Sequence, residues 1–426
     1  MASIFRVGIV RLASPTSSQR LCKVSNHNAI QVAPITSRAT RAQAELEPKP
    51  APFPYWKKQY NLFNMLTDQT ASRFDENTRL LVVDGPPAVG KSGFAKRLAE
   101  QLDMLYMPAP VPEDIYINSY GIDFRKYNNL LPPGAQCIDM ETYYTNPHHK
   151  KIPVLQWYMY HLRFEQYANA LMHMLSTGQG VVLNRCAFSD YVFTDVMHHY
   201  GFISSDAVKR CGTIKQRGEL HLCRPHLVIY LDASVDQVHA NIKKRNIPYE
   251  VNSKFLTTDY LACMEQAYKR YLGKMGTHAY TMVYDWQAAK DVDWIVNDIE
   301  RLDMDNNWER DKKHEDWDFD NTSCVNHVRD ICTNQDQILN QLQPEHMNLP
   351  DEFYDTIDEN TAYDEIVNEH WSERYAPGYN PERDGAQKIL TKRVGDWTFP
   401  VSRYRRRCRD FEYLEESMKR FRKANQ

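Results

Sequence analysis

Residues 85–92, GPPAVGKS, have residue types and spacing that suit the binding of phosphate groups. Gly85 and Gly90 allow backbone angles and a close approach that a Cβ atom would block, so that successive backbone N–H groups can point at phosphate oxygens. Lys91 adds a mobile positive charge, and the Ser92 hydroxyl is a ligand for Mg²⁺. The stretch therefore predicts a phosphate-binding loop, with a tight turn that binds no phosphate as the alternative.

The elements around this loop indicate how it is positioned. An apolar strand is expected at residues 80–84 and a helix from 92 to about 104. Further short apolar runs at 181–183, 227–231 and 281–284 alternate with helical patterns at 154–175, 191–199, 206–220, 235–245, 257–272 and 292–302. Alternating strands and helices predict an α/β fold, in which a parallel β-sheet is flanked by helices on both faces.

Phosphoryl transfer requires more than a loop, because it also needs a base or a positioned acceptor, Mg²⁺, and cations near the developing charge. Glu113 is the candidate base, and Ser92 is the candidate Mg²⁺ ligand once nucleotide is bound. The candidate phosphate-binding residues are the loop and three later cations: Gly85, Ala88, Val89, Gly90, Lys91, Ser92, Arg185, Lys244 and Arg245.

With these residues assembled, residues 78–302 resemble the deoxynucleoside kinase family, which implies a P-loop kinase-like fold. The resemblance rests on the loop together with Glu113, Arg185, Lys244 and Arg245. The similarity is closer to a narrower group, the kinase-like accessory subunits of mitochondrial respiratory complex I. This closer similarity rests on the stretches STGQGVVLNRCAFSDYVF, RPHLVIYLDASVDQVHANIKKRNIP and YAPGYNPE, and it extends to the C-terminal extension, which the kinases lack.

The sequence departs from the kinase pattern where chemistry is expected. In the kinases an Asp or Glu after the second strand takes the proton from the sugar 5′-hydroxyl, but Ala109 stands at the matching position, and Glu113 follows only four residues later. The family's Glu-Arg-Ser reads Asn184-Arg185-Cys186. Gln156 matches the glutamine that grips the base, with a glutamine satisfied in the core as the alternative. The resemblance therefore implies a nucleotide pocket with little or no transfer activity.

The segments outside residues 78–302 differ in composition. Residues 1–44 hold six Arg or Lys and no acidic residue, which is typical of a mitochondrial transit peptide, although a basic tail is an alternative. Residues 45–77 begin as a Pro-rich linker or N-terminal arm, with no core element expected before about Asn61. The remaining 303–426 are expected to form an irregular or helical interaction extension, acidic at first and basic over the last 26 residues.

The resemblance also implies a subcellular location and binding partners. It implies an accessory, non-catalytic subunit among the other complex I subunits, peripheral on the matrix side of the mitochondrial inner membrane, with no nucleic acid partner. No apolar run reaches the roughly 18 residues of a transmembrane helix. A purine nucleotide with Mg²⁺ is the implied ligand, and FAD is a second one that no G-x-G-x-x-G motif supports. An active mitochondrial deoxynucleoside kinase and a nucleotide-sensing binding module are the alternatives.

Overall fold

The computed structural model describes residues 35–43, 49–55, 60, 62–117, 123–286, 292–304, 313–319, 322–333 and 357–370. All of them belong to one compact unit, Val32–Gln426. The predicted transit peptide therefore lies mostly outside the described residues, as does the basic C-terminal stretch.

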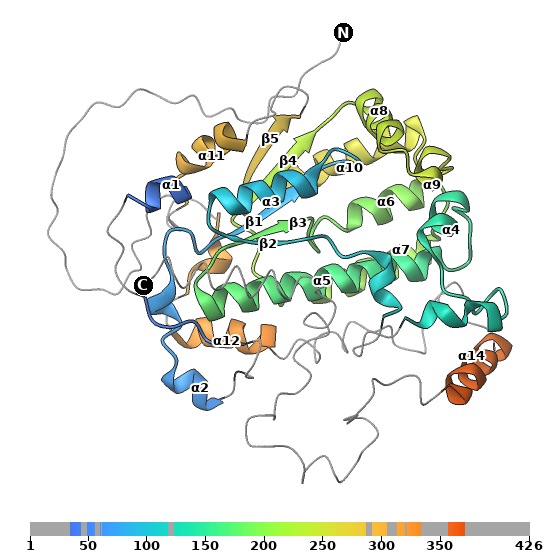
Figure 1. The fold of residues 1–426 in the computed structure, drawn as a ribbon, viewed down its shortest axis with the longest axis horizontal. Coiled ribbons are helices and arrows are strands. Elements are labelled where there is room, and N and C mark those ends of the chain that lie inside the picture. Colours follow the sequence, from blue (N-terminus) through green and yellow to red (C-terminus); the bar gives the residue numbers. More distant parts are fainter. Residues whose placement is uncertain are drawn as a thin grey trace, which may run out of the picture. The chain divides into compact units, whose positions relative to one another are not determined.

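Five parallel strands form one sheet in the order β2-β3-β1-β4-β5 (Figure 1). The strands are β1 (Leu80–Asp84), β2 (Leu105–Met107), β3 (Val181–Asn184), β4 (Leu227–Asp232) and β5 (Tyr280–Asp285). The α/β prediction is thus confirmed. The sequence did not reveal β2, because three residues between the left-handed Asp103 and Pro108 are too few to show a periodicity.

Helices cover both faces of the sheet (Figure 1). Leu81 and Val83 of β1 face a cluster formed with α3 (Lys91–Gln101), α8 (Val235–Arg245) and α11 (Val292–Glu300). Leu80 and Val82 face the other cluster, formed with α5 (Ile152–Thr177), α6 (Tyr191–His199), α7 (Ser205–Glu219) and α10 (Thr258–Met275). Alternate residues of a strand point to opposite faces, so a strand buried on both sides is apolar throughout.

Shorter elements connect and flank these layers. They are α1 (Arg38–Arg41), α2 (Leu62–Thr67), η1 (Ala71–Arg73), η2 (Pro112–Ile115), η3 (Phe124–Leu130), α4 (Met140–Thr145), α9 (Pro248–Val251), η4 (Glu315–Trp317), α12 (Thr322–Thr333) and α14 (Ile357–Glu369). The segments that carry α4 and α9 contribute residues to the site described below.

The expectation of no core element before about Asn61 is wrong. Phe53, Tyr55 and Tyr60 are buried in the same cluster as α5. The backbone N–H of Phe53 donates to the Ser176 carbonyl at 2.9 Å, and the Tyr55 hydroxyl is hydrogen-bonded to His173 at 2.9 Å. Proline fixes an extended path, but aromatic side chains between the prolines still bury their area against a neighbouring helix.

The described part of the C-terminal extension also packs on the kinase-like region. Helix α12 lies against α5, and Asn326 accepts a hydrogen bond from the Tyr60 hydroxyl at 3.0 Å. In α14, Glu359 pairs with Lys150 at 2.8 Å. The boundaries 1–44, 45–77, 78–302 and 303–426 stay predictions, but the flanking segments share contacts with the central region. Among the helices described, none is long and apolar enough to cross a membrane.

Candidate functional site

The loop between β1 and α3 adopts the conformation that its glycines predict. Gly85, Ala88 and Gly90 all have positive φ, at 152°, 58° and 87°. A Cβ atom at Gly85 would lie 2.7 Å from the Leu231 carbonyl oxygen, so the first glycine is required by its neighbour in β4. Gly90 precedes α3, whose N-terminus offers its positive end to an anion.

Lys91 lies within this loop instead of extending into solvent. Its ammonium group donates a hydrogen bond to the Pro86 carbonyl oxygen. Burial lowers the pKa of Lys91 well below its usual value, and repulsion from Arg185 lowers it further, while Asp84 raises it. An anion bound at the loop would favour the charged form of Lys91, because the opposite charge compensates the ammonium group for the hydration that it loses on burial.

Side-chain oxygens at the ends of β1 and β3 and at the start of α3 have the chemistry to hold a Mg²⁺ ion. The Asn184 amide donates to Ser92 Oγ at 2.8 Å, while Asn184 Oδ1 and Asp84 Oδ2 are buried without a hydrogen-bond partner. Burial raises the pKa of Asp84 in spite of the nearby Arg185. Mg²⁺ prefers oxygen ligands and keeps waters and phosphate oxygens in its shell, so Ser92, Asn184 and Asp84 would suit it beside a nucleotide.

A cavity of about 410 Å³ opens beside the loop, a size ordinary for small-molecule sites. The loop forms one end of it, through Lys91 and Ser92, and α5 forms another wall, through Gln156 and Arg163. Other lining residues come from the segment after β2 and from those around α4, α9 and β3: Ala109, Pro110, Met140, Tyr143, Tyr144, Asn184, Arg185, Arg245, Glu250, Phe255 and Leu256.

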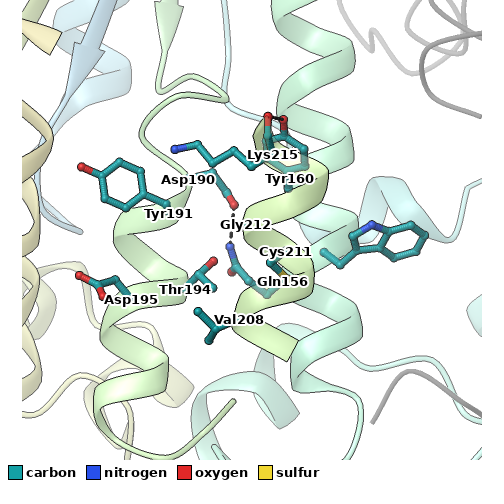
Figure 2. A pocket seen from close by; sticks show the side chains of 11 residues that line it. Gln156, Tyr160, Asp190, Tyr191, Thr194, Asp195, Val208, Cys211, Gly212 and Lys215 are labelled. Atoms are coloured by element: carbon teal, nitrogen blue, oxygen red, sulfur yellow. Dashed lines mark hydrogen bonds between the residues drawn. The ribbon is translucent and has the colours of Figure 1, made fainter. Parts of the chain in front are cut away.

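Asp190, which sequence analysis missed, lies outside the lining of this cavity but holds two of its polar wall residues, Gln156 and Arg163. Figure 2 shows the Gln156 amide directed at the Asp190 carboxylate, to which it donates at 3.0 Å. Arg163 forms a buried ion pair with the same carboxylate, and its guanidinium lies 4.8 Å from the centre of the Phe193 ring. Burial lowers the pKa of Arg163 to about 10, and Arg185 acts in the same direction. Gln156 and Arg163 are seven residues apart, which is about two helical turns, so both lie on the same face of α5. This spacing is the signal in the sequence that could have indicated Arg163 as a second residue of the site.

Behind this wall lies a smaller pocket of about 130 Å³ between α5, α6 and α7 (Figure 2). Gln156 lines both this pocket and the main cavity of about 410 Å³, whereas Asp190 lines only the pocket. The Gln156–Asp190 hydrogen bond is therefore part of the partition between the two spaces, and Gln156 is held by the core while it faces the cavity.

A second cavity, of about 810 Å³, lies on the other side of the loop. The predicted residues Ala88, Val89 and Gly90 meet the predicted cations Lys244 and Arg245 there. Arg97, Ala233, Gln237, Asn241 and Trp286 complete its lining. Trp286 packs edge-on against Phe94 at 5.0 Å and was not predicted, because it follows β5 almost 200 residues after the loop.

Arg185 contacts the loop and also lines the 410 Å³ cavity. It has a left-handed φ of 67°, and its guanidinium donates to the Gly85 carbonyl at 3.5 Å and lies 4.6 Å from the Phe193 ring centre. The arginine after β3 is thus held over the loop, where a planar guanidinium can contact phosphate oxygens.

Comparison with known proteins identifies the family. The sequence profile described as deoxynucleoside kinase matches residues 81–318. The chain belongs to the deoxynucleoside kinase family. Within it, the chain is similar to NADH dehydrogenase (ubiquinone) 1 alpha subcomplex subunit 10, mitochondrial, of Mus musculus, with 33% identity over 332 residues that cover 76% of this chain and 88% of the relative.

Two kinases are more distant relatives in sequence or structure. The deoxyguanosine kinase of Dictyostelium discoideum is 26% identical over 185 residues, which are 43% of this chain and 64% of that protein. The structure of deoxyadenosine kinase from M. mycoides with bound dCTP is 18% identical, with a TM-score of 0.39, and covers 52% of this chain and 100% of that one.

Ala109, for which the resemblance implies a carboxylate in the kinases, lines the cavity. Its match to the position of the kinase base stays a prediction. Glu113 is half-buried on η2 and does not line either cavity, while the neighbouring Asp114 accepts a hydrogen bond from the Val111 N–H at 3.1 Å. A role for Glu113 as the base stays a prediction.

Residues 184–186, which the resemblance matches to the Glu-Arg-Ser of the kinases, lie at the end of β3 and directly after it. Asn184 supplies a neutral amide beside Ser92 instead of a carboxylate. Cys186 is buried, and its thiol contacts the Tyr271 hydroxyl at 3.5 Å. Only Arg185 of the three remains available to an anion in the cavity.

Proposed function

We propose that this chain is an accessory, non-catalytic subunit of mitochondrial respiratory complex I, peripheral on the matrix side of the inner membrane. The name of the Mus musculus relative supports the partner, and 88% of that relative is covered. The arginine-rich, acid-free N-terminus supports mitochondrial import. The other complex I subunits are then its partners, and no role with nucleic acid is included.

The second part of the proposal is that the loop holds a purine nucleotide with Mg²⁺ without transferring its phosphate. The observation that carries it is that Lys91 and Ser92 of the loop line the same cavity as Ala109. Loop N–H groups, Lys91, Arg185, Lys244 and Arg245 would hold phosphates, and Ser92 would hold the metal. Gln156, fixed by Asp190, would grip a base edge through its amide.

The chemistry that remains is binding and orientation. Mg²⁺, when present, neutralises charge on the phosphates. Lys91 and Arg185 position them, but no carboxylate stands at the position of Ala109 to take a hydroxyl proton. Loss of a general base typically removes about 10² to 10⁴ in rate. FAD has no place in this proposal because, among the described strand-to-helix turns, only the one after β1 contains glycine.

A titration followed by an assay tests the nucleotide part. The full chain is titrated with Mg-ATP and with deoxynucleosides, and phosphoryl transfer is then measured in the same samples. We expect saturable Mg-ATP binding without transfer at a rate typical of kinases. Transfer at such a rate would overturn the non-catalytic assignment.

Assembly is tested separately in cells. A tagged full chain should comigrate with complex I on native gels and remain with the membrane fraction until alkaline extraction. A free chain confined to the soluble matrix would contradict the subunit assignment.

An active mitochondrial deoxynucleoside kinase is the second candidate function. It is favoured by the presence of Lys91, Ser92 and Arg185 around one cavity of ordinary ligand size. It requires a replacement base, and Glu113 is the named candidate. Under this hypothesis Glu113→Gln abolishes transfer while Mg-ATP affinity is kept; equal transfer by both proteins would remove Glu113 from the mechanism.

A further inference from the structure

Glu250 is a buried carboxylate within the main cavity. Of the described residues that line this cavity, it is the one acid, whereas Lys91, Arg163, Arg185 and Arg245 supply positive charge. Its side chain is only 7% exposed. A buried carboxylate in a site meant for phosphates is unfavourable unless a cation compensates it.

The compensating cation is Arg245, which lies where the two cavities meet. Arg245 lines both the 410 Å³ and the 810 Å³ cavities, together with the loop residues Ala88 and Gly90. Its guanidinium forms an ion pair with Glu250. The charge of Arg245 also contributes to the lowered pKa of Lys91, so the guanidinium acts on the centre of the loop.

The segment after α8 holds Glu250 in this place. Glu250 lies on α9, and the residues that follow are tied to α4: Ser253 Oγ donates to the Tyr144 carbonyl at 3.2 Å and the Lys254 N–H donates to it at 3.1 Å. The Tyr144 and Tyr249 rings also stack, with 5.7 Å between their centres. The Glu250 carboxylate therefore lies on a segment that is held to α4 by hydrogen bonds and ring stacking.

We propose that Glu250 is an internal competitor for Arg245: it occupies the guanidinium that would otherwise clamp a phosphate, and so it weakens Mg-ATP binding at the loop. This inference rests on the proposed nucleotide binding and identifies an ion pair that lowers the affinity for the nucleotide. Phosphate and carboxylate compete for the same planar set of donors, since guanidinium pairs with either in a bidentate manner. Glu250 also repels the phosphates directly.

Removal of the charge should therefore tighten binding. The full chain and its Glu250→Gln variant are titrated calorimetrically with Mg-ATP at low salt, and we expect the dissociation constant to fall about tenfold in the variant. The gain should shrink in about 0.5 M NaCl, because screening weakens contributions of this kind. Arg245 is 43% exposed, so it remains hydrated after the exchange.

Two controls isolate the effect. Glu219→Gln removes the same charge from an ion pair with Lys215 on α7, which lines neither cavity, and should leave Mg-ATP binding unchanged. In an Arg245→Gln background, Glu250→Gln should produce a clearly smaller gain than in the native chain. Glu250→Ala provides a second test if the Gln variant shows altered thermal unfolding.

The outcomes separate this inference from the proposed function. If the native chain binds Mg-ATP and neither Glu250 variant binds more tightly, the competition is overturned while nucleotide binding stands. If no variant binds Mg-ATP and Lys91→Ala behaves like the native chain, both are overturned. Tighter binding only in the Glu250 variants supports the competition.

Discussion

At the scale of single residues, the loop is a place where charge is buried before any ligand compensates it. Lys91 donates to a carbonyl of its own loop, Asp84 has a carboxylate oxygen without a partner, and Asn184 has an amide oxygen without one. Such groups are costly in a folded protein unless they serve a bound molecule. These groups support the proposal that the loop takes a ligand that brings both negative charge and a cation.

Lys91→Ala should abolish most nucleotide affinity. Its ammonium group is hydrogen-bonded to the loop carbonyl of Pro86 and would pair directly with a bound phosphate, so we expect Mg-ATP binding to weaken by about 10²-fold. Calorimetric titration measures the change, and Lys96→Ala on the exposed side of α3 serves as the matched control. Equal affinities in both variants would show that the loop does not bind the phosphates.

Gly85→Ala should destabilise the fold by about 1–3 kcal/mol, because the added Cβ would lie 2.7 Å from the Leu231 carbonyl at a positive φ. Gly93→Ala is the control: nothing lies within 4 Å of its added Cβ, and alanine favours a helix by up to about 1 kcal/mol. Denaturant unfolding compares the two. A Gly85 variant as stable as the native chain would contradict the close packing of the loop on β4.

At the scale of elements, α5 links the site to the core. It presents Gln156 and Arg163 to the cavity near one end and buries His173 near the other. The Gln179 side-chain oxygen can only accept, so His173 Nε2 donates to it at 3.1 Å, and Nδ1 then accepts from the Tyr55 hydroxyl at 2.9 Å. The ring is therefore neutral, with both nitrogens used.

This arrangement predicts a pH-dependent stability. Burial lowers the pKa of His173 to about 4, so the unfolded chain takes up a proton below about pH 6.5 that the folded chain refuses. The free energy of unfolding should fall by about 3 kcal/mol for this group as the pH drops from 6.5 to 4. Burial also lowers the pKa of His226, which acts in the same direction.

His173→Gln should flatten this dependence. Between about pH 4.5 and 6, the slope of unfolding free energy against pH should decrease by about 1.4 kcal/mol per pH unit relative to the native chain. His199→Gln, at an exposed position on α6, should leave the slope unchanged. An equal slope for the native chain and the His173 variant would show that His173 titrates alike in both states.

At the scale of the whole molecule, the segments on either side of the kinase-like region are joined through one buried cluster. Arg329 of α12 and Arg73 of η1 both pair with Asp68, and Arg329 also donates to the Thr70 hydroxyl at 2.7 Å. The Arg329 guanidinium lies 3.7 Å from the centre of the Tyr60 ring. The arm before β1 and the helix after β5 thus form a common structure against α5.

Arg329→Ala should destabilise the protein by about 3–5 kcal/mol, since it breaks a buried pair and removes the body that fills the space between the rings. Arg301→Ala is the control, because its pair with Asp298 is 65% exposed on the arginine side. That change should cost less than about 1 kcal/mol. Thermal or denaturant unfolding of the full chain measures both, and equal stabilities would contradict the proposed junction.

Much of the fold was readable in the sequence, because the signals are local. An apolar strand, glycines at fixed spacing, Lys91 and a helix follow one another within about 25 residues, and their order determines the loop. Four of the five strands carried clear apolar runs. Arg185 follows β3 directly, and the carboxyl ends of parallel strands lie at one edge of a sheet, so its place near the loop was predictable. Lys244 and Arg245 lie in the last turn of α8 and were predicted from the resemblance to the kinases.

What the sequence by itself determined is therefore the α/β class and the loop with its glycines and Lys91, while phosphate binding there and the match of Ala109 to a kinase carboxylate stay predictions. Only the tertiary structure decided that Asp190 fixes Gln156, that Trp286 lines the second cavity, that Glu250 pairs with Arg245 inside the first, and that aromatics before Asn61 join the core. Each of these depends on contacts between residues that lie far apart in the sequence or on a short segment held by such contacts. The periodicity of apolar residues carries no information about contacts of this kind. Local propensity can specify an element, but the partner of a buried charge is set by packing.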